Sequence, residues 1–129
     1  MITISKKSEY GLHFLTALAN TPQQQHLSIT TVSKKLGLPY RFLSQIAGQL
    51  KKADLVVSRE GVKGGYKLKK DPSQITLRQI IEIFDGPIGI VSCQIGKKCQ
   101  IDDTCQLKNQ FHSLRLDLVK LFENKKVSE

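Results

Sequence analysis

The sequence predicts a mainly α-helical fold that carries one small β-sheet. Five segments repeat their apolar residues with the spacing of helices, and two short segments near the middle have the residue pattern of strands. The chain has 129 residues, which is room for one ordinary domain of roughly 100–150 residues. Its 40% hydrophobic and 24% charged residues are typical of a globular protein.

The first predicted helix covers residues 5–19 and ends at Thr21-Pro22. Its apolar residues form two faces, one with Tyr10, Phe14, Ala17 and Leu18 and the other with Leu12, Leu15 and Ala19. Apolar residues spread this widely predict a helix that is largely buried.

Two shorter helices follow, joined by a tight turn. We expect Thr30 to cap the first helix, Gly37 to end it, and Pro39 to take the first position of the second helix. The second helix has an inward apolar stripe of Leu43, Ile46 and Leu50. Its outward residues are Tyr40, Arg41, Ser44, Gln45, Gln49 and Lys52. This pair of helices predicts a helix-turn-helix unit.

Residues 55–58 and 66–69 are expected to form two strands, joined by the loop of residues 59–65, which is rich in glycine and cations. Three helices followed by a two-stranded wing are the order of a winged helix-turn-helix. We therefore assign residues 1–72 to a winged helix-turn-helix DNA-binding region.

Residues 73–129 form the second predicted region of the same compact domain. Thr76 and Gln79 have the spacing of a capping box at the start of a helix that Asp85-Gly86-Pro87 ends. A loop over residues 88–105 leads into a long helix from about Thr104 to Asn124. Apolar residues follow a 4-3-4-3 spacing in that helix: Leu107, Phe111, Leu114, Leu118 and Leu121. This spacing predicts a dimerisation helix, although a lone helix can also fold back on its own domain.

The positive charge lies in the first half of the chain. Residues 1–70 hold 12 Lys and Arg against 3 Asp and Glu, whereas residues 71–129 hold 8 of each, so the first half carries the whole net charge of +9. This segregation favours double-stranded DNA as the partner, and a dimer predicts a roughly palindromic operator. Arg41 is expected to contact either a guanine or phosphate alone. The candidate DNA-binding residues are Thr30, Tyr40, Arg41, Ser44, Gln45, Lys51, Lys52, Arg59 and Lys63.

Cys93, Cys99 and Cys105 are spaced evenly, with five residues between neighbours. Zinc sites favour pairs two to four residues apart, so this spacing is not a zinc pattern. Three thiols on one loop are compatible with an iron–sulfur cluster. Three free buried cysteines, or a thiol redox switch without metal, remain open alternatives.

Several classes of protein are excluded. The apolar stretches are far shorter than the ~18–20 residues of a membrane span, and the first residues lack the order of a signal peptide, which predicts a cytoplasmic protein without a membrane partner. No phosphate-binding glycine loop, catalytic triad or pair of carboxylates is visible, so we predict that the chain is not an enzyme.

Three motifs resemble a family of winged-helix regulators that includes the iron–sulfur regulator IscR and the nitric-oxide sensor NsrR. They are Lys7-Ser8-Glu9-Tyr10-Gly11-Leu12, the wing sequence Gly64-Gly65-Tyr66-Lys67-Leu68, and Ile80-Ile81-Glu82 with the three-cysteine loop. The resemblance covers nearly the full length. It implies a homodimeric, cytoplasmic transcription regulator with an iron–sulfur cluster, 2Fe–2S or 4Fe–4S, on Cys93, Cys99 and Cys105. A metal-free regulator that responds through thiols or a small effector is the alternative.

The chain departs from this family at two places. Lys108 stands where the iron–sulfur regulators have a histidine as fourth ligand, and Glu60-Gly61 replaces the usual Arg-Gly of the wing. The resemblance implies Glu9, reaching over from the partner subunit, as the fourth ligand, with His13 as the second choice. His112 is the third candidate because, seven residues beyond Cys105, it lies on a suitable face of the predicted long helix. Contact of the wing with DNA would then depend on Arg59 or Lys63.

Overall fold

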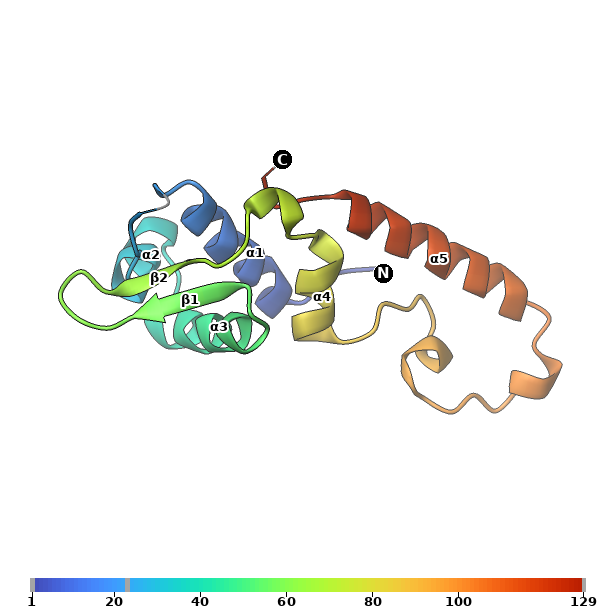
Figure 1. The fold of residues 1–129 in the computed structure, drawn as a ribbon. Coiled ribbons are helices and arrows are strands. Elements are labelled where there is room, and N and C mark those ends of the chain that lie inside the picture. The colour runs from blue at the N-terminus through green and yellow to red at the C-terminus, as the bar shows by residue number, and fades with distance from the viewer. Residues whose placement is uncertain (1, 23, 129) are drawn as a thin grey trace.

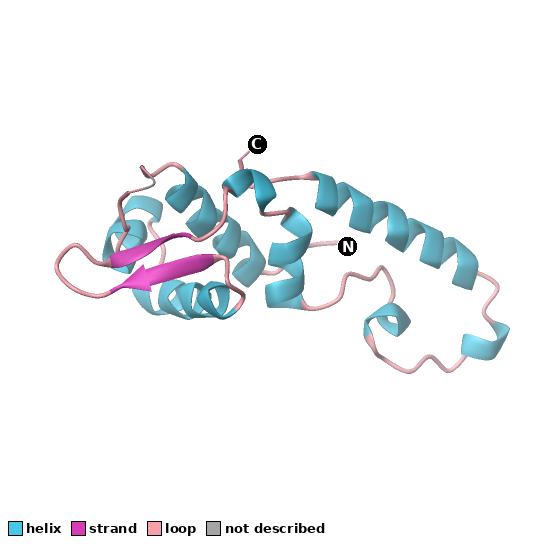
Figure 2. Ribbon diagram, in the orientation of Figure 1, coloured by secondary structure: helices cyan, strands magenta, loops and turns pink. Residues whose placement is uncertain are grey.

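The computed structural model describes residues 2–22 and 24–128. Helices α1 (Lys6–Ala19), α2 (Ile29–Leu36) and α3 (Tyr40–Lys52) come first, followed by strands β1 (Val56–Arg59) and β2 (Gly65–Leu68). Helices α4 (Leu77–Asp85) and α5 (Lys108–Asn124) complete the fold, with single 3-10 turns at Pro72–Gln74, Ser92–Ile95 and Asp102–Thr104. The fold class is therefore confirmed, as Figures 1 and 2 show. Among the described residues, no helix has both the length and the apolar content that crossing a bilayer requires.

The start of α2 differs from the prediction. Ser28, not Thr30, is the N-cap, because the Ser28 hydroxyl accepts a hydrogen bond from the Thr31 N–H at 3.1 Å. The preceding residue, Leu27, is bridged to Tyr66 in β2, so the chain is still extended there and turns into the helix directly afterwards. Thr30 lies exposed in the first turn of α2. The end of α2 is confirmed, since Gly37 has a positive φ of 68°.

Two other boundaries are shifted. Pro39 is the N-cap of α3 with an extended ψ of 133°, and the helix begins at Tyr40. Helix α5 begins at Lys108, four residues later than predicted, because residues 102–104 form a separate 3-10 turn that the Thr104 N–H closes on the Ile101 carbonyl oxygen. Cys105 therefore lies before the helix and not in its first turn. Each strand also lies one residue away from its predicted position.

The main core lies between α1, α2, α3, α4 and the sheet. Phe14, Leu15, Leu43 and Leu50 are completely buried, which confirms the inward stripe predicted for α3. The ring of Tyr66 in β2 packs edge-on against Phe14, with 5.9 Å between the ring centroids. The two strands are antiparallel in register Val56↔Leu68 to Arg59↔Gly65, and the Leu27↔Tyr66 bridge attaches them to the segment before α2. The sheet thus holds α2 and α3 in a fixed orientation.

Helix α4 crosses α1 at close range. A Cβ atom added to Gly11 would lie 2.5 Å from Cε2 of Phe84, so only glycine fits there without a shift. Beside this crossing, Asp85 at the end of α4 accepts hydrogen bonds from the Ser5 N–H at 3.1 Å and from the buried Ser8 hydroxyl at 2.9 Å. Partial burial opposes ionisation of Asp85, but these hydrogen bonds from Ser5 and Ser8 outweigh it and lower the pKa of its carboxyl.

The C-terminal half of helix α5 packs against α4, and its N-terminal end, which follows the cysteine loop, extends away from the main body (Figure 1). A second small core joins the two helices, formed by Ile81, Ile88 and Val119 with Leu77, Leu118 and Phe122 around them. After α5 the chain returns to the body, where the Val127 N–H donates to the Ile75 carbonyl oxygen at 3.0 Å. The capping box at the start of α4 is confirmed, with both Thr76–Gln79 hydrogen bonds present.

Candidate DNA-binding face and cysteine loop

The outer face of α3 carries the residues predicted to read DNA bases. Tyr40, Arg41 and Gln45 are exposed and Ser44 is half-buried, while the opposite face of the helix is buried in the main core. The side chain of Tyr40 is 55% exposed although it is large and aromatic. An exposed helix face of this length and chemistry fits the major groove of duplex DNA.

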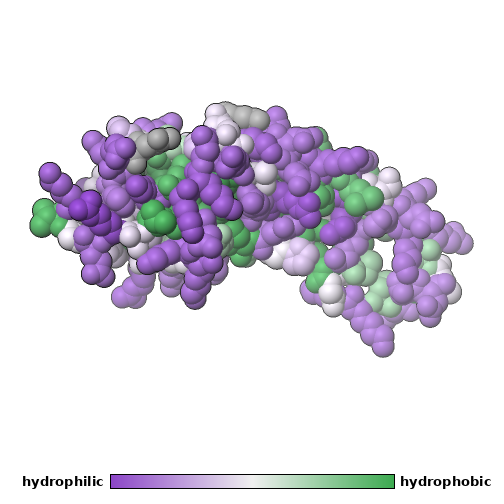
Figure 3. Space-filling model, viewed as in Figure 1, coloured by the Kyte–Doolittle hydropathy of each residue, from purple (hydrophilic) through white to green (hydrophobic). Residues whose placement is uncertain are grey.

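Exposed cations lie on α3 and on the wing. Arg41, Lys51, Lys52, Arg59 and Lys63 are exposed, and within residues 2–22 and 24–128 none of them forms an ion pair with a carboxylate. Free ammonium and guanidinium groups are available to phosphates, because no carboxylate of the described chain neutralises them. In Figure 3 the surface around the strands and the wing loop is mostly hydrophilic.

A groove of about 480 Å³ separates the wing loop from the start of α2. Arg59 and Lys63 line one side, and Ser28 and Thr31, the capping pair of α2, line the other. N–H groups at a helix start and nearby cations together attract anions. Ser28 and Thr31 were not among the predicted DNA-binding residues, because the expected cap was Thr30. The bridge from Leu27 to Tyr66 places the cap at Ser28 instead.

The three cysteines line one cavity. Cys93 lies exposed in the 3-10 turn of residues 92–95, whereas Cys99 and Cys105 are half-buried. All three border a cavity of about 150 Å³ at the start of α5, together with Gln94, Asp102, Lys108, Phe111 and His112. The fold therefore brings together three thiols that are twelve residues apart in sequence from first to last.

Of the three residues predicted as fourth ligands, one lies at the cysteine cavity and two lie on α1. His112 lines the cysteine cavity. Glu9 and His13 lie on α1 and do not line it, and the Glu9 carboxylate is paired with Lys6 at 3.2 Å. Within one chain, therefore, only His112 of these three candidates lies beside the thiols, and Glu9 or His13 would have to come from a second copy.

The cavity has the donor type of an iron–sulfur site but not the geometry of a single-ion site. Within the described ranges, no group of three or more His, Cys, Asp or Glu side chains is placed to hold one metal ion. In a 4Fe–4S cluster each thiolate binds a different iron atom, so the thiolate sulfurs stand farther apart than the ligands of one ion. Three thiols around one shared cavity therefore fit an iron–sulfur cluster better than a single metal ion.

Lys108 and Asp102 close one side of this cavity. The Lys108 Nζ lies 2.9 Å from Asp102 Oδ1. The hydrogen bond and charge of Asp102 raise the pKa of Lys108, with smaller contributions from Asp103 and Cys105. Lys108 therefore stays protonated and cannot act as a ligand, unlike the histidine that iron–sulfur regulators of similar sequence have at this position.

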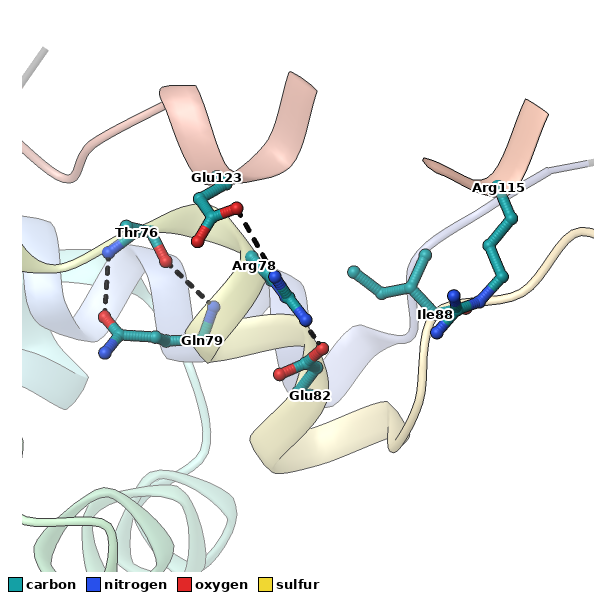
Figure 4. A network of polar contacts seen from close by, with 7 residues as sticks. All are labelled: Thr76, Arg78, Gln79, Glu82, Ile88, Arg115 and Glu123. Carbon is teal, nitrogen blue, oxygen red and sulfur yellow. Dashed lines mark hydrogen bonds and ion pairs between the residues drawn. The ribbon is translucent and has the colours of Figure 1, made fainter. Parts of the chain in front are cut away.

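Polar contacts join the cysteine loop to α5 and α5 to α4 (Figure 4). The Arg115 Nε donates to the carbonyl oxygen of Ile88, at the beginning of the loop, at 2.7 Å. Arg78 on α4 donates to Glu82 at 3.0 Å and to Glu123 on α5 at 3.3 Å. The contacts of Arg115 and Glu123 are not visible in the sequence, because their partners lie 27 and 45 residues away.

The predicted apolar seam of α5 is divided between two environments. Leu107, Leu114 and Leu121 are 47%, 51% and 60% exposed. Leu118 packs on the second core, and Phe111 is half-buried at the cysteine cavity. Part of the seam is therefore used within the chain, while a stripe repeating every seven residues is exposed. Apolar patches are visible along this part of the molecule in Figure 3.

A family model described as Rrf2, iron-dependent transcriptional regulator, matches residues 4–129. The chain belongs to the Rrf2 family. An rrf2-like HTH-type transcriptional regulator of Rhodobacter capsulatus is 34% identical over 105 residues, which are 79% of this chain and 70% of that relative. The HTH-type transcriptional regulator IscR of Serratia proteamaculans is 29% identical over 102 residues, or 79% of this chain but only 62% of its own length.

The solved structure of CymR, the global cysteine regulator of B. subtilis, is similar to the Rrf2 chain over its whole length. It matches with a TM-score of 0.82 and 26% identity, covering 99% of this chain and 95% of that one. Family membership and fold thus confirm the resemblance drawn from the sequence motifs. The chain is an Rrf2-type transcription regulator, as are the relatives from Rhodobacter capsulatus and Serratia proteamaculans by their descriptions.

Proposed function

We propose that this Rrf2 chain is a homodimeric DNA-binding regulator whose affinity for its operator is set by an iron–sulfur cluster on Cys93, Cys99 and Cys105. The observation that carries the proposal is the single cavity that these three thiols line at the start of α5. When bound, a cluster of this kind supplies a centre that responds to nitric oxide, redox state or iron supply.

Residues of this chain can transmit a change at the cavity toward the DNA. Arg115 ties the beginning of the cysteine loop to α5, and Arg78 ties α5 to α4. Asp85 then ties α4 to the start of α1, against which α3 packs. A shift of the loop would change the angle of α5, and in a dimer built on α5 it would change the distance between the two α3 helices. The signal would act by shifting the population between two dimer geometries.

The exposed stripe of Leu107, Leu114 and Leu121 supports the dimer. Leu107 is the N-cap of the 17-residue helix α5, and Leu114 and Leu121 lie within the helix. A seven-residue repeat of this kind along one face is the spacing of a helix-to-helix seam. The cation-lined face of α3 and the wing supports DNA as the ligand. If six cations per subunit contact phosphates, log K should fall with log salt with a slope of about −5 per subunit.

A metal-free thiol regulator is the second candidate. The similarity to B. subtilis CymR over 99% of the chain favours it, since that protein is described as the global cysteine regulator. The exposed Cys93 also favours it, because an accessible thiol is open to oxidation.

Anaerobic purification separates the two candidates. The cluster proposal expects coloured protein containing iron and sulfide, and Cys93→Ser should remove both the colour and the metal. A colourless, iron-free protein whose DNA binding changes with a mild oxidant and recovers with a thiol reductant would instead support the second candidate. The DNA probe would be a duplex selected by the protein from random sequences, with binding measured on cluster-bound and cluster-free protein.

A further inference from the structure

Four side chains that can ligate iron through sulfur or neutral nitrogen meet at one place in this chain. Cys93, Cys99 and Cys105 come from the loop, and His112 comes from α5. The cysteines alone leave a cluster that takes four protein ligands one ligand short. The identity of the fourth ligand decides whether one subunit holds the cluster by itself or shares it with its partner.

His112 faces the cavity because of helix geometry. Lys108, Phe111 and His112 are spaced i, i+3, i+4 on α5, so they project from one side of the helix, and all three line the cavity. The segment belongs to the first two turns of a 17-residue helix that Arg115 and Leu118 anchor to the rest of the chain. The imidazole is therefore held on a rigid element at the edge of the thiol cavity.

Other polar groups of the cavity are less suited to the role. Asp102 is paired with Lys108 at 2.9 Å, and an ammonium group has no lone pair to donate. The Gln94 side-chain oxygen accepts the Ile90 N–H at 2.8 Å. His112 has no hydrogen-bond or ion-pair partner within residues 2–22 and 24–128, so its ring nitrogens are available.

We propose that His112 is the fourth ligand of the cluster, so that each subunit binds its cluster with residues of its own loop and α5. This inference rests on the proposed function. It differs from ligation by Glu9 or His13, which would require the partner subunit. One consequence is that the ligand set stays attached to α5, so a change at the cluster acts directly on the helix that carries the exposed leucine stripe.

The test compares full-length variants purified without oxygen. His112→Ala should alter the absorption bands of the cluster and speed its loss to an iron chelator by about tenfold or more, while His112→Cys should restore retention. His26→Ala, a histidine beside the wing, is the matched control and should retain the cluster like the unmodified protein. Because His112 is exposed, far-ultraviolet circular dichroism should show that His112→Ala is folded.

A spectroscopic measurement identifies the ligand directly. Pulsed electron paramagnetic resonance of the reduced protein labelled with nitrogen-15 histidine should show a strongly coupled nitrogen that His112→Ala removes. If the unmodified protein binds no iron or sulfide, the proposed function fails and this inference falls with it. If it binds a cluster that His112→Ala leaves unchanged while Glu9→Gln or His13→Ala destabilises it, only the His112 assignment is overturned.

Discussion

The guanidinium of Arg115 donates a hydrogen bond of 2.7 Å to the backbone carbonyl of Ile88 (Figure 4). Ile88 is where the cysteine loop begins, and its side chain packs in the second core with Val119 of α5. The hydrogen bond and the packing contact together attach the beginning of the loop to the long helix. The protein's own contacts therefore couple the position of the loop to that of α5, without a bound ligand.

Replacing Arg115 with methionine should loosen this attachment. The carbonyl of the buried Ile88 would lose its charged donor, at a cost of about 1–2 kcal/mol in the free energy of unfolding. Urea unfolding at fixed protein concentration measures the loss. Trypsin should also cut faster at the exposed Lys97 and Lys98 of the loop. Arg59→Met on the wing is the control and should change stability by less than about 0.5 kcal/mol, and equal effects of the two variants would contradict the prediction.

Gly11→Ala and Gly48→Ala should act in opposite directions. The new methyl at Gly11 would lie 2.5 Å from the Phe84 ring, so we expect a loss of about 1–3 kcal/mol. A Cβ at Gly48 in α3 meets nothing within 4 Å, so alanine should stabilise that helix by up to about 1 kcal/mol. Thermal or urea unfolding shows whether each variant is more or less stable than the unmodified protein. Stabilisation by Gly11→Ala would mean that α1 and α4 are not closely crossed.

Arg41 and Lys63 should contribute to DNA binding in different ways. Arg41→Ala should cost about 1–3 kcal/mol on the selected duplex and little on random DNA, if the guanidinium reads a base. Lys63→Ala should weaken binding to both duplexes alike and reduce the salt slope by about one. Titrations at several salt concentrations measure both effects. Lys120→Ala on α5 is the control, and a uniform loss with Arg41→Ala would reassign Arg41 to phosphate.

Asp85 should make stability depend on pH in the acidic range. The pKa of its carboxyl is lowered in the folded protein because hydrogen bonds from Ser5 and Ser8 outweigh its partial burial. Its stabilising effect is therefore present above the ordinary pKa of 3.8 and is lost as the pH falls through the lowered folded value. Asp85 is exposed, so we expect less than about 1 kcal/mol. Asp85→Asn should destabilise the protein more at pH 7 than at a pH well below 3.8, and an equal effect at both pH values would refute this role.

Leu114→Glu should prevent dimerisation. The side chain is 51% exposed in the middle of the predicted seam, and a buried carboxylate at a helix-to-helix contact is unfavourable. Analytical ultracentrifugation should detect monomers, and binding to a palindromic duplex should weaken. Leu116→Glu, at a residue 45% exposed and outside the 4-3-4-3 seam, is the matched control and should leave the dimer intact. A monomeric unmodified protein would remove the basis of the prediction.

Much of the candidate site follows from local patterns. The outward face of α3, the inward stripe of Leu43 and Leu50 and the Thr76–Gln79 capping box are determined by residues within one or two helical turns of one another. For that reason they could be predicted in the right places. The positive charge of the first 70 residues is likewise a property of composition, and it predicts DNA as the partner without any knowledge of the fold.

Contacts between residues far apart in the chain decided the cap of α2 and which residues of α5 are buried. Ser28 rather than Thr30 caps α2 because a bridge to Tyr66 keeps the chain extended up to that point. Leu118 faces inward because it packs against the second core, which contains Ile81 and Ile88.

The amino-acid sequence by itself determined the five helices, the Thr76–Gln79 capping box, the turn at Gly37, the cationic first half and the even spacing of the thiols, since each depends on residues close together in the chain. Only the tertiary structure decided that the three thiols share a cavity with His112 and that Arg115 links their loop to α5. Spacing along a chain does not specify which side chains meet once a loop of this length has folded onto a helix.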